Sequence, residues 1–141
     1  MRIWLNGRLV PSEEATVSVF DRGFLFGDGV YELIRYFNGV GLDLDAHITR
    51  LGRSLAQTRI TGFDPRDVPT IGAALLEDAS LRDAGLYLQV TRGTGATRAH
   101  VPPRGLQPTV CAMISELPPL DALTTPGTLR AVLREDRRWL R

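Results

Sequence analysis

Alternating apolar and polar positions at the start of the chain predict a β-hairpin. Residues 3–10 read Ile-Trp-Leu-Asn-Gly-Arg-Leu-Val, so an Asn-Gly pair stands between two short apolar runs. Asn-Gly flanked by hydrophobic residues is the strongest local signal for a two-residue hairpin turn. A second hairpin is predicted where the apolar run Val30–Phe37 ends at Asn38-Gly39 and residues 40–44 return as its partner.

The next segment predicts a helix, because apolar residues recur at three- and four-residue spacing between residues 45 and 60. Asp45 stands where an N-cap is expected, directly ahead of this run. His47 and Arg50 lie off the apolar stripe and three positions apart, so they share a second face. The stripe itself consists of Ile48, Leu51 and Leu55.

Another helix and two strands are predicted in the second half of the chain. The helix follows Asp64-Pro65 and ends near Gly85. Residues 86–91 and 109–115 are β-rich, and a loop at 92–108 with three glycines and three prolines separates them. A loop of this length inside a compact domain usually has a function of its own. The apolar side of the helix is formed by Ile71, Leu75 and Leu76.

This order of strands, two helices and strands predicts an α+β fold with a mostly antiparallel sheet, since the early strands are joined by hairpins. We expect residues 1–117 to form one small domain and residues 118–127 to be a linker. Residues 128–141 would then begin the first strand of a C-terminal domain. A lone strand is not stable alone, so we expect the chain to be a truncated piece of a longer protein.

Composition narrows the classes of function. The chain has 141 residues, of which 43% are hydrophobic and 23% charged, which suits a single globular domain. A formal net charge of +1 gives no reason to expect nucleic acid or an anionic membrane as a partner. No apolar run is long enough to span a bilayer and no signal-peptide pattern is present, so we expect a cytoplasmic location. We assign no metal site.

All 17 basic residues are arginine, and the chain contains no lysine. A guanidinium is permanently charged and cannot form a Schiff base, whereas a lysine amine can. Any chemistry that needs a lysine nucleophile therefore cannot be completed by this chain.

The densest motif spans residues 21–32, Asp-Arg-Gly-Phe-Leu-Phe-Gly-Asp-Gly-Val-Tyr-Glu, with three glycines within seven positions. We interpret it as a glycine-rich bend that presents Tyr31 to a pocket and is pinned by the flanking apolar residues Phe24, Phe26, Val30, Leu33 and Ile34. A tight β-turn without chemistry fits the residues equally well. The stretch resembles the DRG-x-x-FGDG-x-YE signature of the class IV, fold-type IV pyridoxal-phosphate enzymes. That family includes D-amino-acid aminotransferases, branched-chain aminotransferases and aminodeoxychorismate lyase.

The resemblance assigns roles to two residues of the first helix. In the family, an arginine in an H-x-x-R helix grips the cofactor phosphate, and Arg50 in His-Ile-Thr-Arg matches it. A guanidinium fork suits phosphate oxygens. His47 is expected to support Arg50, and a purely structural histidine is equally compatible with the pattern. Without the resemblance, Arg50 would be read as an ordinary surface arginine.

A second motif, Arg98-Ala99-His100, lies in the long loop after Gln-Val-Thr-Arg-Gly at residues 89–93. Spacing alone favours a solvated loop with chance charges. The pair is similar to that of the D-amino-acid aminotransferases, in which it holds the substrate α-carboxylate together with the tyrosine that matches Tyr31. In that family the loop crosses a dimer interface, which implies a homodimer.

Residues 137–141, Arg-Arg-Trp-Leu-Arg, resemble the family's stretch just before the Schiff-base lysine, and Arg138 is assigned a supporting role on that basis. We assign no catalytic residue within the chain itself. The resemblance implies part of a pyridoxal 5′-phosphate enzyme that transfers an amino group from a D-amino acid to a 2-oxo acid. The alternatives are an aminodeoxychorismate lyase, a branched-chain aminotransferase or a non-catalytic dimerising domain.

Overall fold

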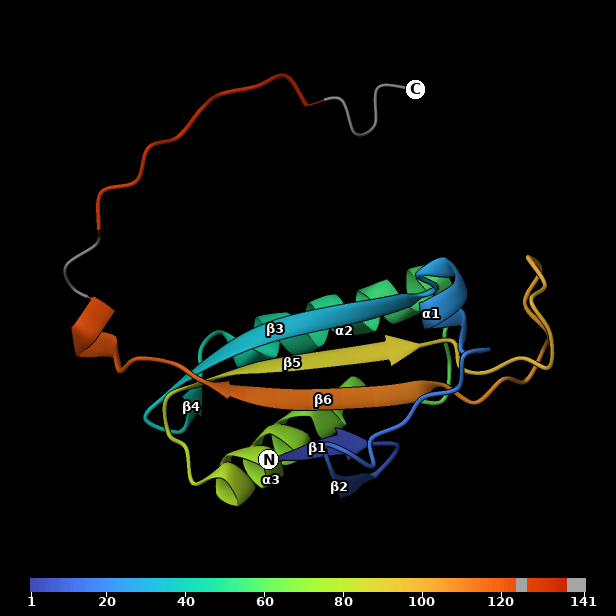
Figure 1. Ribbon diagram of the computed structural model, residues 1–141, viewed down its shortest axis with the longest axis horizontal. Coiled ribbons are helices and arrows are strands. Elements are labelled where there is room, and N and C mark those ends of the chain that lie inside the picture. Colours follow the sequence, from blue (N-terminus) through green and yellow to red (C-terminus); the bar gives the residue numbers. More distant parts are fainter. Residues whose placement is uncertain (124–126, 137–141) are drawn as a thin grey trace.

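The fold is α+β, as the sequence predicts, and it is built on one antiparallel sheet (Figure 1). The computed structural model describes residues 1–123 and 127–136. In these residues the sheet has six strands in the order β2-β1-β6-β5-β3-β4. The strands are β1 (Arg2–Leu5), β2 (Arg8–Pro11), β3 (Gly29–Phe37), β4 (Val40–Gly41), β5 (Ala84–Thr91) and β6 (Thr109–Glu116).

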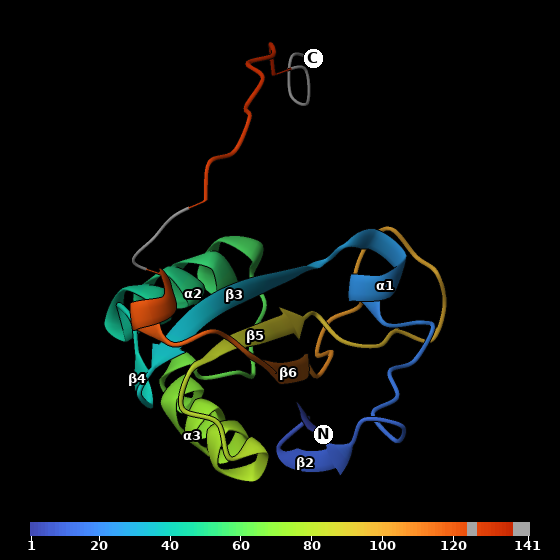
Figure 2. The ribbon, with the colours of Figure 1, turned by 60° about the vertical axis from the view of Figure 1, so that its left-hand side comes forward.

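The two longer helices cover one face of this sheet. α2 (Leu44–Thr58) lies behind β3, and α3 (Val68–Ala79) lies behind β1 and β6, as Figures 1 and 2 show. Each helix packs an apolar stripe against the strands, because residues spaced three or four positions apart lie on the same face of a helix. The remaining helical segments are α1 (Arg22–Phe26) and the 3₁₀ turns η1 (Pro65–Asp67) and η2 (Leu120–Leu123).

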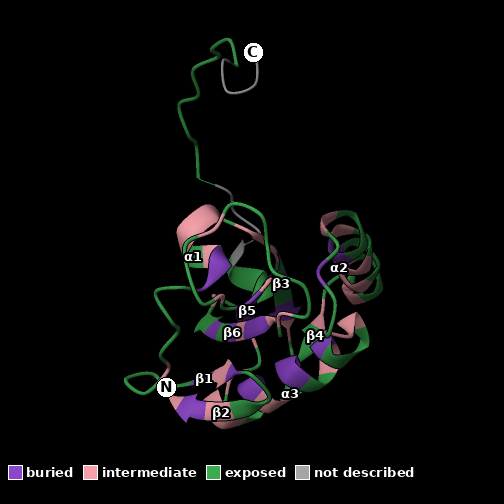
Figure 3. Ribbon diagram, turned by 90° about the vertical axis from the view of Figure 1, so that its right-hand side faces the viewer, coloured by how far each residue is buried: buried purple, intermediate pink, exposed green. Residues whose placement is uncertain are grey.

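The core lies between the sheet and these helices. The central strand β5 is buried along most of its length, and Figure 3 shows buried residues on the adjoining strands and helix faces. The predicted helix stripes are confirmed, since Leu51, Leu55, Ile71 and Leu75 are all buried. Neither α2 nor α3 covers the opposite face of the sheet, where Gly23 of α1 packs against Thr91 at the end of β5.

Local chemistry explains both hairpins. β1 and β2 pair in the register Leu5↔Arg8, with Asn6 and Gly7 at positive φ between them, which is the backbone of a two-residue hairpin turn. β3 and β4 are joined in the same way through Asn38 and Gly39. β4 is shorter than expected, because only two of the residues 40–44 pair before α2 begins.

Several details of the sequence prediction are wrong. The N-cap of α2 is Asp43, which has a left-handed backbone and makes no side-chain cap, and Asp45 lies within the first turn. α3 ends at Ala79 with Ser80 as its cap, and Gly85 is a paired residue of β5. Residues 127–136 are exposed and form neither helix nor strand, and the first strand of a C-terminal domain expected at 128–141 stays a prediction.

The glycine-rich motif also differs from the expected bend. Residues 22–26 form the short helix α1, and β3 starts at Gly29, three residues before Glu32. Of the flanking apolar residues expected to anchor the motif, Ile34 is buried and Val30 packs against the core, whereas Phe24 and Leu33 are 76% and 57% exposed. Polar contacts complete the anchoring.

One buried hydroxyl has no partner in the described residues. Tyr36 of β3 is 4% exposed and its hydroxyl makes no hydrogen bond. Burial raises the pKa of Tyr36. The hydroxyl lies over Gly72 of α3, and a Cβ at that position would overlap the phenol oxygen. Gly72 therefore allows the helix to approach the sheet at this point.

We predict that Tyr36→Phe raises the free energy of unfolding by about 1 kcal/mol, because it removes a buried polar group without a partner. Gly72→Ala should lower it by about 2 kcal/mol through overpacking. In the Tyr36→Phe background the loss from Gly72→Ala should be smaller, since the nearest overlapping atom is gone. Urea unfolding of the four proteins measures this coupling. Additive effects, or a less stable Tyr36→Phe protein, would contradict the packing described here.

Candidate functional site

The motif at residues 21–32 is anchored by a buried aspartate. Asp21 is 1% exposed and accepts hydrogen bonds from the Gly23 amide (2.7 Å), the Thr91 hydroxyl (3.0 Å) and the Thr109 hydroxyl (2.6 Å). A buried carboxylate without a cation needs several donors to replace its hydration. These three bonds cap α1 and fix it against the ends of β5 and β6.

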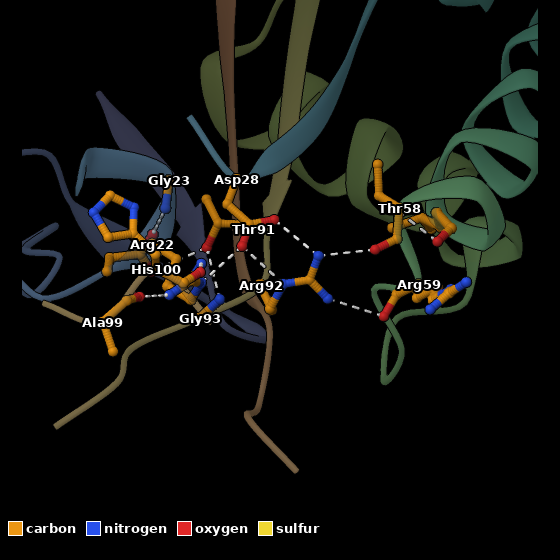
Figure 4. Close-up of polar contacts among 12 residues, drawn as sticks. Arg22, Gly23, Asp28, Thr58, Arg59, Thr91, Arg92, Gly93, Ala99 and His100 are labelled. Carbon is orange, nitrogen blue, oxygen red and sulfur yellow. Dashed lines mark hydrogen bonds and ion pairs between the residues drawn. The ribbon is translucent and has the colours of Figure 1, made fainter. Parts of the chain in front are cut away.

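A second aspartate holds two arginines. Asp28 accepts from Arg22 Nε at 2.7 Å and from Arg92 Nε and Nη2 at 2.8 and 2.9 Å (Figure 4). The hydrogen bond from Arg92 is the largest influence, and with that from Arg22 it holds the pKa of Asp28 below its usual value despite partial burial. Charge-assisted contacts of this kind are stronger than neutral hydrogen bonds.

Arg22 extends this clamp into the long loop. Its side chain is 6% exposed, and its Nη1 and Nη2 atoms donate to the carbonyls of Ala99 (2.6 Å) and His100 (3.0 Å). The base of the loop is closed as well, because Gly93 has a φ of 97° and packs directly on the carbonyl of Gln107. The loop at 92–108 is thus held both at its base and near its middle.

The two loop residues that the motif singled out meet on one aromatic ring. The Arg98 guanidinium lies 4.9 Å from the centre of the Phe26 ring, and the His100 ring centre lies 5.3 Å from it. Arg22 contacts the same ring at 4.7 Å. Both Arg98 and His100 are exposed to solvent. Two guanidinium groups and one imidazole therefore contact the Phe26 ring. This role of Phe26 was not predicted from the sequence.

Arg50 and His47 meet on Glu32. Arg50 Nε donates to Glu32 Oε1 at 2.8 Å, and one Nη atom contacts Oε2. His47 Nδ1 lies 2.7 Å from Glu32 Oε2. The Glu32 side chain is 2% exposed, whereas that of Arg50 is 59% exposed. The carboxylate therefore fixes the guanidinium from beneath and leaves its other side open to solvent.

The charge of Glu32 is stabilised by these contacts. Burial alone raises its pKa, but the hydrogen bonds and charges of Arg50 and His47 outweigh burial and leave the pKa below its usual value. Sequence reasoning did not assign Glu32 a role. The signal was available, since Glu32 alternates with the buried residues Ile34 and Tyr36 on β3 and a carboxylate on that face requires partners.

Tyr31 points to the other side of β3. It is 66% exposed and its ring stacks on Tyr87 at a centroid distance of 5.8 Å. Tyr31 also adds a small electrostatic contribution to the raised pKa of Arg50, after the larger effects of Glu32. No hydrogen bond within the described residues joins Tyr31 to Arg98 or His100. Arg98 and His100 thus contact the same Phe26 ring, and Arg50 and His47 contact the same Glu32 carboxylate. Tyr31 has no hydrogen bond to any of these four residues in the described part of the chain.

Comparison with known proteins identifies the family. The sequence profile of amino-transferase class IV matches residues 29–141. The chain belongs to the class IV aminotransferases. It is 41% identical over its full length to a D-alanine aminotransferase from Bacillus licheniformis and 35% identical to one from Listeria monocytogenes. In both cases the chain spans half the length of the relative.

Solved structures of class IV aminotransferase relatives have the same fold. The branched-chain amino acid aminotransferase of Escherichia coli matches with a TM-score of 0.76 at 22% identity, over 82% of this chain and 41% of that one. The 4-amino-4-deoxychorismate lyase of Pseudomonas aeruginosa matches with a TM-score of 0.68 at 32% identity, over 82% and 40%. Both likenesses concern less than half of the solved chain.

Two further predictions from the sequence concern Arg138 and membrane-spanning helices. Arg138, the supporting residue predicted near the end of the class IV chain, lies outside the described residues. Across the described parts of the chain, 1–123 and 127–136, no helix is both long and apolar enough to cross a membrane.

We predict that Glu32→Gln lowers the free energy of unfolding by about 2 kcal/mol at pH 7, because an amide cannot replace a carboxylate between two donors. The folded-state pKa of Glu32 is depressed, so its stabilisation is complete above the unfolded pKa of about 4.3. It is lost as pH falls through the folded pKa. The difference between wild type and Glu32→Gln should therefore shrink at pH 3.

Urea unfolding at pH 7 and pH 3, followed by circular dichroism, measures this difference. Glu77→Gln serves as the control, since Glu77 is exposed at the end of α3 and should change stability little at either pH. An equal loss for Glu32→Gln at both pH values would show that its effect comes from packing and not from charge.

We predict that Arg22→Gln releases the middle of the loop. Amide hydrogen exchange at residues 97–101 should accelerate about tenfold, because two carbonyl contacts and the link to Asp28 are lost. The matched control is Arg104→Gln, which lies on the same loop but has no hydrogen-bond partner among the residues described. Unchanged exchange at residues 97–101 in Arg22→Gln would mean that the loop is held by other contacts.

Proposed function

We propose that this chain forms the anion-binding part of a pyridoxal 5′-phosphate-dependent aminotransferase that moves an amino group from a D-amino acid to a 2-oxo acid. The observation that carries the proposal is the meeting of Arg98 and His100 on Phe26, in a loop held by Arg22. The resemblance of this pair to D-amino-acid aminotransferases and the identity to D-alanine aminotransferases both support the assignment.

Arg50 fits the phosphate of the cofactor. Its Nε and one Nη contact Glu32, and no contact to the other Nη is present in the described residues. A guanidinium has five N–H donors, so donors remain for phosphate oxygens after Glu32 is satisfied. His47, hydrogen-bonded to the same carboxylate, restricts the rotation of Glu32 and so helps to orient Arg50.

Arg98, His100 and Tyr31 would hold the α-carboxylate of the substrate. A guanidinium and an imidazole side by side can both donate to one carboxylate, and a phenol adds a third donor. Tyr31 does not reach the other two within one chain. We therefore propose a homodimer, in which the loop of one subunit approaches Tyr31 of its partner, as the resemblance implies.

When bound, pyridoxal phosphate supplies the electron sink for breaking bonds at the amino-acid α-carbon. The residues of this chain contribute binding and orientation. Because the chain contains no lysine, the amine that links covalently to the cofactor must come from outside these 141 residues. We accordingly expect no catalysis from this chain alone, and a dimerising module without activity is the corresponding alternative for it.

An aminodeoxychorismate lyase is the second candidate, supported by the 32% identity to the Pseudomonas aeruginosa lyase structure. The Arg98 and His100 pair argues against it, because the resemblance confines that pair to the D-amino-acid enzymes. A branched-chain aminotransferase is disfavoured for the same reason.

To test this, the chain is extended at its C-terminus to the length of its relatives and assayed for aminotransferase activity. We predict amino transfer from D-alanine to 2-oxoglutarate. Arg98→Gln should raise KM for D-alanine about tenfold, since one charge-assisted contact is lost. Arg35→Gln, an exposed arginine on β3, is the control. Activity only with L-branched-chain substrates, or only pyruvate release from aminodeoxychorismate, would overturn the assignment.

A further inference from the structure

A cavity beside the base of the long loop brings three arginines together. It has a volume of about 360 Å³ and lies between the end of α2 and residues 102–106. We call it the arginine pocket and define it by Arg59, Thr61, Arg92 and Arg104, with Pro102 and Pro103 forming one wall. We propose that the arginine pocket binds a small multivalent anion, either a phosphate or a dicarboxylate.

The lining of the arginine pocket is positively charged. The lining residues include three arginines and no aspartate or glutamate. The Arg59 and Arg104 side chains have no hydrogen-bond or ion-pair partner within the described chain, and both residues are exposed. Arg92 is already ion-paired with Asp28, so the uncompensated positive charge at the cavity comes from Arg59 and Arg104, and this charge attracts an anion. Planar guanidinium forks also match the oxygen geometry of phosphate and carboxylate groups.

The Arg92 side chain is preorganised beside the arginine pocket. Its orientation is fixed, because it donates to both oxygens of Asp28 and to the carbonyls of Thr58 (2.8 Å) and Arg59 (3.1 Å). Those carbonyls form the C-terminal end of α2, where the helix dipole disfavours an anion. The Arg92 contacts satisfy them, which offsets much of that penalty. Figure 4 shows Arg92 between Asp28 and these two carbonyls.

The size of the cavity limits the ligand. A volume of about 360 Å³ is near the lower end for small-molecule sites. It suits inorganic phosphate or a dicarboxylate of four or five carbons. The rigid backbone of Pro102 and Pro103 keeps this wall in place at low entropic cost on binding.

The arginine pocket is separate from the residues of the proposed function. Arg50, Arg98 and His100 do not line it. It is nevertheless linked to the loop that bears Arg98 and His100, because Arg92 and Arg22 share Asp28 and Arg22 holds the two loop carbonyls. The inference does not depend on transaminase activity, and it can be tested on the 141-residue chain.

The 15N-labelled chain is titrated with inorganic phosphate and, in a second experiment, with succinate. Chloride keeps the ionic strength constant in both titrations. NMR follows the Nε–H signals of Arg59, Arg92 and Arg104. We expect saturable shifts of these signals with at least one of the two anions. The double variant Arg59→Gln/Arg104→Gln should weaken that binding about tenfold or more, because two charge-assisted contacts are lost.

The matched control is Arg8→Gln/Arg35→Gln, which removes the same charge from two exposed arginines outside the pocket. It should keep the wild-type affinity. Arg50→Gln should keep it too, which separates the arginine pocket from the proposed phosphate contact of Arg50. Saturation with phosphate alone or succinate alone identifies the ligand class. Equal weakening in both double variants, or no saturable shift with either anion, would overturn the proposal.

Discussion

A single carboxylate connects most of what is distinctive in this domain. Asp28 stands between α1 and β3 and binds two arginines that come from opposite directions. Arg22 carries the connection to the middle of the long loop, and Arg92 carries it to the last turn of α2. A carboxylate that accepts from two guanidiniums remains charged over the physiological pH range, so the connection does not weaken near neutrality. The loop, the helix and the start of β3 are therefore positioned by one shared ionic centre.

A similar arrangement recurs at Glu32, which contacts Arg50 and His47 of α2. A buried acid lies beneath an exposed arginine and fixes its direction, while the outer donors of the arginine stay available. The domain relies on arginine alone for positive charge, and a guanidinium keeps that charge at every pH a protein encounters. The charge of these arginine clusters therefore does not depend on proton uptake.

The sequence predicted the architecture well because its signals are local. Asn-Gly pairs specified both hairpins, and apolar periodicity located α2 and α3. The errors occurred where a distant contact decides the outcome. Asp45 is a residue type that often caps helices, but the chain enters α2 two residues earlier, through the left-handed Asp43. Cap positions depend on how the preceding strand delivers the chain, which composition does not encode.

The candidate site was predicted unevenly for the same reason. Motif resemblance singled out Arg50, Arg98 and His100, and the structure places each beside a partner. The partners themselves were missed. Phe26 and Glu32 act through contacts with residues that are far away in sequence, and no spacing rule connects them. Arg22 was visible in the motif, but its reach to Ala99 spans 77 positions and emerges only from the folded chain.

The closure of the long loop at Gly93 has a consequence for how this domain can diversify. The two ends of the loop meet where Gly93 packs on the Gln107 carbonyl, and Arg22 binds backbone carbonyls in its middle, so the side chains near the tip have little influence on the sheet. Residues near the tip can be exchanged, shortened or lengthened with little strain on the strands. Related domains can therefore acquire different ligand preferences through changes in this one segment, while the sheet and the helices stay the same.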